Sequence, residues 1–278
     1  MNPLIKLNKI ILGLVLLILS SMSNALDLPI DSRIPGGIAV IDLHSPVEME
    51  VSFNNRKILQ IKDKDNNYWA VIGIPLKQKV GKVSYTVNGI NKQFLIKDKA
   101  YKEQYLTVKR KHSNPPADQI KRIQKESRLS KKVFTSFSNI NKDSNFNSFL
   151  LPSQGPISSP FGLKRFFNKQ ARRPHSGIDI AAPRGADILA PAAGKIVLTG
   201  NFFFNGNSIF IDHGQGLITM YCHMDTLEVV QGKMVSAGEL IGKVGSTGRA
   251  TGPHLHWTVS LNNTRVEPLL FLAPTAFK

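Results

Sequence analysis

Histidines that could bind a metal are concentrated in the C-terminal half of the chain, where residues 175–179 read HSGID. His175 and Asp179 are four residues apart, but the preceding Pro174 and the intervening Gly177 argue against a helix. In an extended strand, residues four apart are separated by about 13 Å, whereas two ligands of one zinc ion lie at most about 4.4 Å apart. If both side chains bind one ion, the chain must bend between them, and Gly177 permits that bend.

A second pattern, HLHW at residues 254–257, predicts a strand that carries metal ligands. Strand alternation puts His254 and His256 on one face, while Leu255 and Trp257 face a core. Two imidazoles side by side on a polar face, backed by apolar residues, form a recurrent metal-site arrangement. Paired histidines on a solvated face are the alternative.

The run MYCH at residues 220–223 supplies another candidate. Alternation places Tyr221 and His223 on one face, and Met220 and Cys222 on the other. Cys222 is the only cysteine of the chain, and we expect it to be a buried small hydrophobe rather than a catalytic thiol. His223 ends the β-like run, where a side chain can face a site, although a structural role is the alternative.

Four histidines and one aspartate in these patterns suit zinc. Zinc in hydrolases commonly takes three protein ligands and leaves a position for water, and neutral His and carboxylate are suitable ligands for it. Such an ion lowers the pKa of the water to about 7 and polarises the scissile carbonyl. The sequence has no His-Glu-x-x-His motif to supply a glutamate base. The two histidines left over from metal binding are therefore the natural groups to handle protons.

Residues 150–278 are expected to form the antiparallel β domain that positions these side chains. Glycine is frequent, short β-like runs recur between Pro and Gly, and no long helical period is present. The expected strands are 188–190, 194–198, 208–212, 217–223, 240–244 and 254–261.

Residues 26–110 are expected to form a separate, small β-sandwich-like domain. Short strand-like runs alternate with turn signals, of which Asn88-Gly89 is the strongest hairpin signal. Asn54-Asn55 predicts another tight turn. The lone His44 in this region is interpreted as structural.

Residues 111–149 are expected to form a basic helical connector followed by a linker. Residues 118–137 are polar and moderately helical, and the chain from Lys97 to Lys132 holds twelve Lys or Arg against four Asp or Glu. A solvated helix face is one interpretation of this charge, and electrostatic attachment to an anionic cell wall is another.

Residues 1–25 are typical of a secretory signal peptide. Lys6 and Lys9 precede an almost unbroken apolar run at 10–19, and Ser23-Asn24-Ala25 offers the small residues of a cleavage site. The run is shorter than the ~20 apolar residues that span a bilayer. We expect cleavage after Ala25 and no permanent membrane span afterwards, with an uncleaved anchor as the alternative. The single cysteine lies far from this segment, which argues against a lipoprotein.

The formal net charge is +17 at neutral pH, and +15 remains without Lys6 and Lys9. A surplus of this size indicates an anionic partner. Export to the periplasm or cell envelope argues against nucleic acid, whereas the carboxylates of peptidoglycan stem peptides suit both charge and compartment. A generally basic, solvated surface is the alternative.

Residues 155–270 resemble the lysostaphin/LytM-type zinc endopeptidases. The matching segments are ISSPFG at 157–162, HSGIDI at 175–180, APAAG at 190–194, MYCHM at 220–224, GSTG at 245–248 and HLH at 254–256. Cys222 stands where the family often has alanine, and Asp225 stands where serine is frequent.

The resemblance implies that His175, Asp179 and His256 bind Zn2+. It also implies that His223 and His254 act on the water and on the developing oxyanion. Some members of this family have lost ligands, bind no zinc and activate amidases, but all five positions are intact here.

The leading hypothesis is therefore a zinc-dependent endopeptidase that hydrolyses peptide crosslinks of peptidoglycan, of the D-alanyl–diaminopimelate type. The alternatives are a non-catalytic wall-binding protein that activates amidases, and a secreted lysin aimed at the glycine bridges of other cells. Residues 26–148 are also a candidate for intramolecular regulation, because they are as large as the catalytic part and contain a linker.

Overall fold

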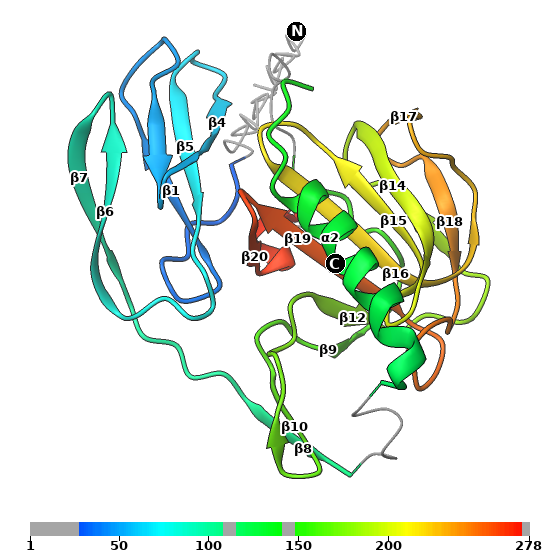
Figure 1. The fold of residues 1–278 in the computed structure, drawn as a ribbon. Coiled ribbons are helices and arrows are strands. Elements are labelled where there is room, and N and C mark those ends of the chain that lie inside the picture. Colours follow the sequence, from blue (N-terminus) through cyan, green and yellow to red (C-terminus); the bar gives the residue numbers. More distant parts are fainter. Residues whose placement is uncertain (1–27, 108–114, 141–147, 274–278) are drawn as a thin grey trace, which may run out of the picture.

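The computed structural model describes residues 28–107, 115–140 and 148–273, which form two β units joined by a strand and a helix (Figure 1). The mainly β fold expected from the sequence is confirmed. The expected signal peptide, residues 1–25, lies outside the described residues. Among the residues that are described, no helix combines the length and the apolar character needed to cross a membrane.

The N-terminal unit is a sandwich of two antiparallel sheets. One sheet has the strand order β1 (Ile38–Asp42), β5 (Tyr68–Gly73) and β4 (Leu59–Lys62). The other has the order β3 (Arg56–Lys57), β2 (Val51–Phe53), β6 (Gly81–Val87) and β7 (Ile90–Ile96). Alternation sends apolar side chains of both sheets inward, and Ala39, Ile72 and Phe94 are among those in the shared core.

Both predicted tight turns of this unit are present. Asn88 and Gly89, between β6 and β7, have φ values of 48° and 76°. Asn54 and Asn55, between β2 and β3, have φ values of 50° and 58°. Two consecutive residues with positive φ favour Asn and Gly and match the twist of a hairpin. These turns therefore account for the short connections of the four-stranded sheet.

The C-terminal unit is built on a ten-stranded sheet in which all named pairs are antiparallel. Its central strands are β14 (Gly194–Phe202), β15 (Gly206–Asp212), β16 (Leu217–Leu227) and β19 (Leu255–Leu261). The remaining strands are β9 (Ile157–Ser159), β12 (Ile178–Ile180), β13 (Asp187–Leu189), β17 (Met234–Val235), β18 (Leu240–Val244) and β20 (Thr264–Val266), and the short helix η2 (Pro268–Phe271) follows β20.

The two faces of β19 have different surroundings. Leu255, Trp257 and Val259 point into the main core of the C-terminal unit. Because side chains alternate along a strand, His256 and Thr258 lie on the opposite face. Part of this opposite face is covered by a helix, and the candidate metal ligands lie on another part of it.

The covering helix is α2 (Ile120–Phe134), which follows the short helix η1 (Ala117–Gln119) and lies against β14 (Figure 1). Phe134 is buried in a second apolar cluster with Phe210, Met220 and Cys222. Glu126 accepts a hydrogen bond from Phe203 N at 2.9 Å. Residues 120–134 of the basic connector expected from the sequence are therefore helical, and the helix packs on the sheet through Val133 and Phe134 at its C-terminal end.

The connection between the two units adds a strand to the C-terminal half. β8 (Glu103–Leu106) pairs in parallel with β10 (Lys164–Phe167), which also pairs with β11 (Gln170–Ala171). The rings of Tyr105 and Phe166 stack at 4.5 Å across this pairing. The domain boundary expected near residue 110 places β8 in the N-terminal part, whereas its pairing partner β10 lies in the C-terminal part.

The two units also contact each other directly. Gln60 and Gln215 exchange two hydrogen bonds of 3.0 Å between side chain and backbone. Arg56 Nη1 donates to Asn262 O at 3.1 Å. These contacts hold the sandwich against the turn that follows β15 and the turn that follows β19.

Candidate metal centre

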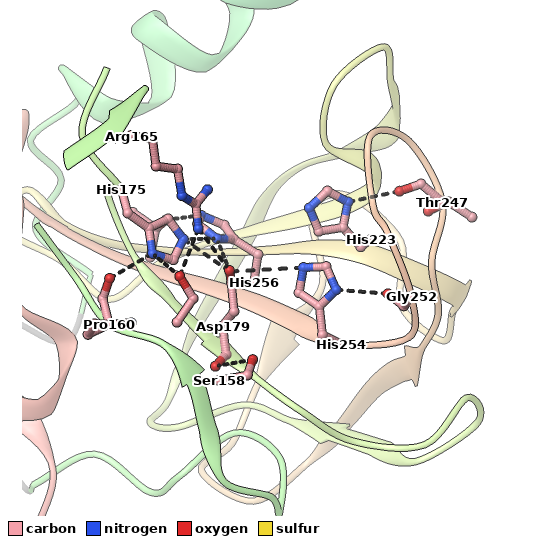
Figure 2. A network of polar contacts seen from close by, with 12 residues as sticks. Ser158, Pro160, Arg165, His175, Asp179, His223, Thr247, Gly252, His254 and His256 are labelled. Atoms are coloured by element: carbon pink, nitrogen blue, oxygen red, sulfur yellow. Dashed lines mark hydrogen bonds and ion pairs between the residues drawn. The ribbon is translucent and has the colours of Figure 1, made fainter. Parts of the chain in front are cut away.

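The register between β12 and β19 brings Asp179 and His256 together. The two residues are directly paired across the strands, and His256 Nδ1 lies 2.7 Å from Asp179 Oδ1 (Figure 2). Directly opposed side chains of an antiparallel pair lie on the same face of the sheet. Two ligand candidates 77 residues apart therefore meet through ordinary strand pairing.

His175 completes the group from the irregular segment before β12. Its Nε2 lies 3.0 Å from Asp179 Oδ1 and 3.0 Å from His256 Nδ1. Among the described residues, one group of three or more His, Cys, Asp or Glu side chains has its ligand atoms close enough together to hold one metal ion. It consists of His175, Asp179 and His256. The expected bend between His175 and Asp179 is therefore present.

Gly177 has a different role from the one expected. Its φ is not positive, so the bend does not depend on the left-handed conformation that glycine favours. A Cβ at this position would lie 2.3 Å from Trp257 O and 2.7 Å from Thr258 Oγ1. Glycine is needed here because the backbone passes directly against β19.

The donor set fits a zinc ion. His175 Nδ1 lies 2.8 Å from the carbonyl oxygen of Pro160, and His256 Nε2 lies 3.0 Å from Thr258 Oγ1. Because a carbonyl oxygen only accepts, Nδ1 of His175 carries the proton and its Nε2 lone pair faces the centre. When His256 Nε2 donates its proton to the Thr258 hydroxyl, the lone pair on His256 Nδ1 is likewise free to bind a metal. Such outer hydrogen bonds orient metal-binding histidines, and two histidines with one carboxylate are a common zinc set.

The ionisation states also suit metal binding. Burial opposes ionisation of Asp179, but hydrogen bonds from His175 and His256 outweigh it and hold the pKa of this carboxyl well below its usual range. Burial lowers the pKa of His256, and this effect exceeds the opposing attraction of Asp179. At neutral pH the site therefore offers a carboxylate and a neutral imidazole, the forms that bind a metal.

His223 and His254 lie beside this group. Their ring centroids are 4.8 Å apart, and His254 Nε2 lies 3.9 Å from Asp179 Oδ1 (Figure 2). His223 Nδ1 bonds to Thr247 O at 2.8 Å, and His254 Nδ1 bonds to Gly252 O at 2.9 Å. Both Nδ1 atoms therefore carry protons, which leaves each Nε2 available.

Alternation predicted the wrong face of β16 for His223, although this residue does face the candidate site. Strict alternation would place it beside Tyr221, which is buried in the main core. Instead, His223 has a φ of 62° in β16, and its ring lies 6.2 Å from that of His256. This left-handed residue interrupts the alternation and turns the imidazole toward the ligand group. Positive φ at a residue other than glycine is strained, and such strain is often found at functional sites.

His44, His213 and Cys222 are not members of this ligand group, although Cys222 is paired with His256 across β16 and β19. His213 is buried between Ala193 O and Thr219 Oγ1, and His44 is exposed beside Asp42. Burial raises the pKa of the Cys222 thiol to about 12, which agrees with its interpretation as a hydrophobe.

One charged neighbour of the ligands was not singled out from the sequence. Arg165 Nη2 lies 3.3 Å from Asp179 Oδ2 (Figure 2). No short-range pattern marks this residue, because its position depends on the pairing of β10 with β8.

Asp225, which departs from the resembled motif, forms an ion pair with Arg184. Arg184 also donates to Ser246 Oγ at 2.7 Å. The substitution is therefore accommodated by a surface pair, and Asp225 is not one of the grouped ligand candidates.

Two family models match the chain. Peptidase family M23 matches residues 173–268, and the peptidase family M23 N-terminal domain matches residues 31–99. The first range contains all five candidate site residues, and the second covers the sandwich.

Individual proteins are also similar. A crystal structure of a protein from Pseudomonas aeruginosa assigned to peptidase M23 is 37% identical, with a TM-score of 0.74, over 89% of this chain and 97% of that one. DD-carboxypeptidase/endopeptidase Mpg of Neisseria meningitidis is 44% identical over 43% of this chain and 27% of the relative. Peptidoglycan DD-endopeptidase ShyA of Vibrio cholerae is 36% identical over 47% of this chain and 31% of the relative.

The match to these two curated relatives covers less than a third of their length. The Pseudomonas structure, in contrast, is matched over nearly its whole length, including both β units. On this similarity and the two family models, the chain belongs to peptidase family M23.

Proposed function

We propose that the protein is a zinc-dependent endopeptidase that hydrolyses peptide crosslinks of bacterial peptidoglycan. The observation that carries the proposal is the convergence of ligand atoms from His175, Asp179 and His256, with neighbouring distances of 2.7–3.0 Å. The names of the curated relatives support the substrate class. The surplus of positive charge suits an acidic wall polymer.

In this proposal, His175, Asp179 and His256 hold the zinc ion. When bound, zinc lowers the pKa of the attacking water and polarises the scissile carbonyl. The Pro160 carbonyl and the Thr258 hydroxyl keep the two imidazoles in the tautomers that binding requires. The protein thus supplies a fixed site before the substrate arrives.

His223 and His254 handle the protons. We assign acceptance of the proton of water to His254, because its Nε2 faces Asp179 Oδ1 at 3.9 Å. Burial lowers the pKa of His223 to about 4, so this imidazole is neutral in the resting protein. Negative charge that develops on the carbonyl oxygen favours the charged imidazole, so His223 would take up a proton from solvent at Nε2 in this step and donate the resulting Nε2–H to that oxygen.

The bond that we propose is the D-alanyl–diaminopimelate crosslink. Two curated relatives carry names that include a DD-endopeptidase or a DD-carboxypeptidase activity. The same names support an envelope or periplasmic location for this chain, which agrees with the signal peptide expected at residues 1–25.

The test is digestion of purified sacculi with residues 26–278, followed by mass spectrometry of the products. We expect loss of crosslinked dimers, inhibition by a chelator and recovery with zinc. A His175→Ala variant should be inactive and free of zinc. Protein that lacks stoichiometric zinc and releases no product would instead support the non-catalytic, amidase-activating alternative, and activity only on glycine bridges would support a secreted lysin.

We further propose that residues 150–278 form the catalytic domain and that residues 26–148 regulate it. The packing of α2 on the same sheet face as His256, and the pairing of β8 with β10, support this coupling. Purified 150–278 should differ from 26–278 in its rate on sacculi. Equal rates would remove regulation by the N-terminal region.

A further inference from the structure

Arg165 joins the candidate metal centre through the oxygen of Asp179 that faces away from the histidines. Its Nη2 lies 3.3 Å from Asp179 Oδ2 and 2.8 Å from Ser159 Oγ. The other oxygen, Oδ1, is the one that approaches His175 and His256. The two oxygens of this carboxylate therefore have separate partners.

The same side chain is linked to His175. Ser159 Oγ, which accepts from Arg165, lies 3.3 Å from His175 Nδ1. Ser159 is paired with Asp179 across β9 and β12. Arg165 thus contacts a compact group of strand residues that surrounds two of the three ligand candidates.

The strand that carries Arg165 is held on both sides. Gln104 of β8 is its partner in the parallel pairing, and β11 pairs with β10 from the other side. The adjacent Lys164 has half of its side chain exposed and pairs with Glu103 on the surface. Since neighbouring residues of a strand point to opposite sides, only Arg165 of this basic pair faces the ligands.

This placement is poor for stability alone. The Arg165 side chain is 25% exposed, and its Nε is buried with no hydrogen-bond partner among the described residues. A buried donor without a partner is unfavourable for folding, and a buried ion pair gives little net stability. Such groups call for another explanation, and the contact with Asp179 provides one.

We propose that Arg165 is a positioning residue that fixes Asp179 as a one-oxygen metal ligand. This inference rests on the proposed zinc site. By holding Oδ2, the guanidinium prevents rotation of the carboxylate and directs Oδ1 toward the point that His175 Nε2 and His256 Nδ1 also face. Arg165 contacts neither the metal nor the substrate in this role, and it acts through Asp179.

The experiment compares Arg165→Met, Arg165→Lys and the control Lys164→Met in residues 26–278. Lys164→Met removes a positive charge from the same strand without reaching Asp179. Zinc affinity is measured by competition with a chelating dye, and Co2+-loaded protein gives an absorption spectrum of the ligand geometry. Thermal unfolding of the metal-free proteins checks that each variant folds.

We expect Arg165→Met to weaken zinc binding about 10- to 100-fold, the usual loss for an outer-shell partner, and to shift the Co2+ spectrum. Arg165→Lys should bind zinc more tightly than Arg165→Met but less tightly than the parent protein. The lysine ammonium group keeps the positive charge but lacks the planar, two-donor geometry of the guanidinium. Lys164→Met should stay within about twofold of the parent protein, as expected for an exposed charge. A purely structural role would lower the unfolding temperature without changing the affinity of the folded protein.

The inference would be overturned if Arg165→Met left both the zinc affinity and the Co2+ spectrum unchanged. It would also be overturned if the parent protein bound no zinc. If the parent protein binds zinc but leaves sacculi intact, the proposed endopeptidase function fails while the affinity ratio still decides the role of Arg165.

Discussion

His256 Nδ1 lies 2.7 Å from Asp179 Oδ1 because the two residues are opposite each other on β12 and β19. The distance is set by strand register, so the ligand group is part of the sheet rather than of a loop. A site on regular strands is held more rigidly than one on loops. The consequences for metal binding, turnover and stability can be tested separately.

Asp179→Asn should bind zinc more than about 100-fold more weakly than the parent protein, because losses of 10- to 100-fold already follow from outer-shell changes. The amide keeps the size of the side chain but removes the charge that both histidines face. Chelator competition measures the loss. Asp187→Asn is the matched control, since the Asp187 side chain is 59% exposed and pairs with Lys243. Unchanged affinity in Asp179→Asn would reject this ligand.

His223→Ala and His254→Ala should each keep stoichiometric zinc but lower turnover about 100- to 10,000-fold, the range for loss of an acid or base. Their Nδ1 atoms bond to backbone carbonyls, and neither residue belongs to the close ligand group. Metal analysis and release of sacculus peptides are measured on the same samples. Loss of zinc from either variant would show that a ligand had been mistaken for a proton-handling residue.

Gly177→Ala should destabilise the protein by about 1–3 kcal/mol, as overpacking does, and should weaken zinc binding. The added Cβ would lie 2.3 Å from Trp257 O and would push β12 away from β19. Denaturant unfolding measures the change in free energy. In Gly200→Ala, by contrast, the nearest group is Phe202 Cε2 at 3.5 Å, so this control should fold normally. Equal stability of both variants would contradict the close approach.

The stability of the fold should fall as the pH drops from about 6.5 to about 4, in part because of His213. Burial lowers the pKa of this imidazole from 6.5 to about 4. In that window the unfolded chain binds a proton and the folded protein does not, so unfolding is favoured at lower pH. The pKa difference corresponds to on the order of 3 kcal/mol.

Denaturant unfolding of His213→Gln should therefore show a weaker dependence on pH across this window than the parent protein. His44→Gln is the control, because the His44 side chain is 83% exposed. An identical pH dependence in the parent protein and His213→Gln would contradict the linkage.

Local patterns were sufficient for much of the fold. Asn88-Gly89 predicted its hairpin because the preference for positive φ is a property of the two residues themselves. The alternation at residues 254–257 predicted that His254 and His256 share a face, and both approach Asp179 Oδ1, at 3.9 Å and 2.7 Å. The assignment of ligands and proton-handling residues came from the resemblance and stays a prediction.

The remaining features depend on contacts between distant segments. His223 faces the site only because β16 adopts a left-handed residue there, and alternation alone gives the opposite face. Gly177 is required by the approach of β19, which lies about 80 residues further along the chain. The pairing of β8 with β10, and with it the position of Arg165, depends on tertiary structure and has no local signal.

The pairing of β8 with β10 also has a mechanical consequence. β8, the stretch that leads out of the sandwich, is paired through four residue pairs with β10, the strand that carries Arg165. Tension applied to the sandwich, for example by attachment to a stretched polymer, would therefore load β10 before it reached α2. Displacement of the sandwich would thereby reach the contact of Arg165 with Asp179.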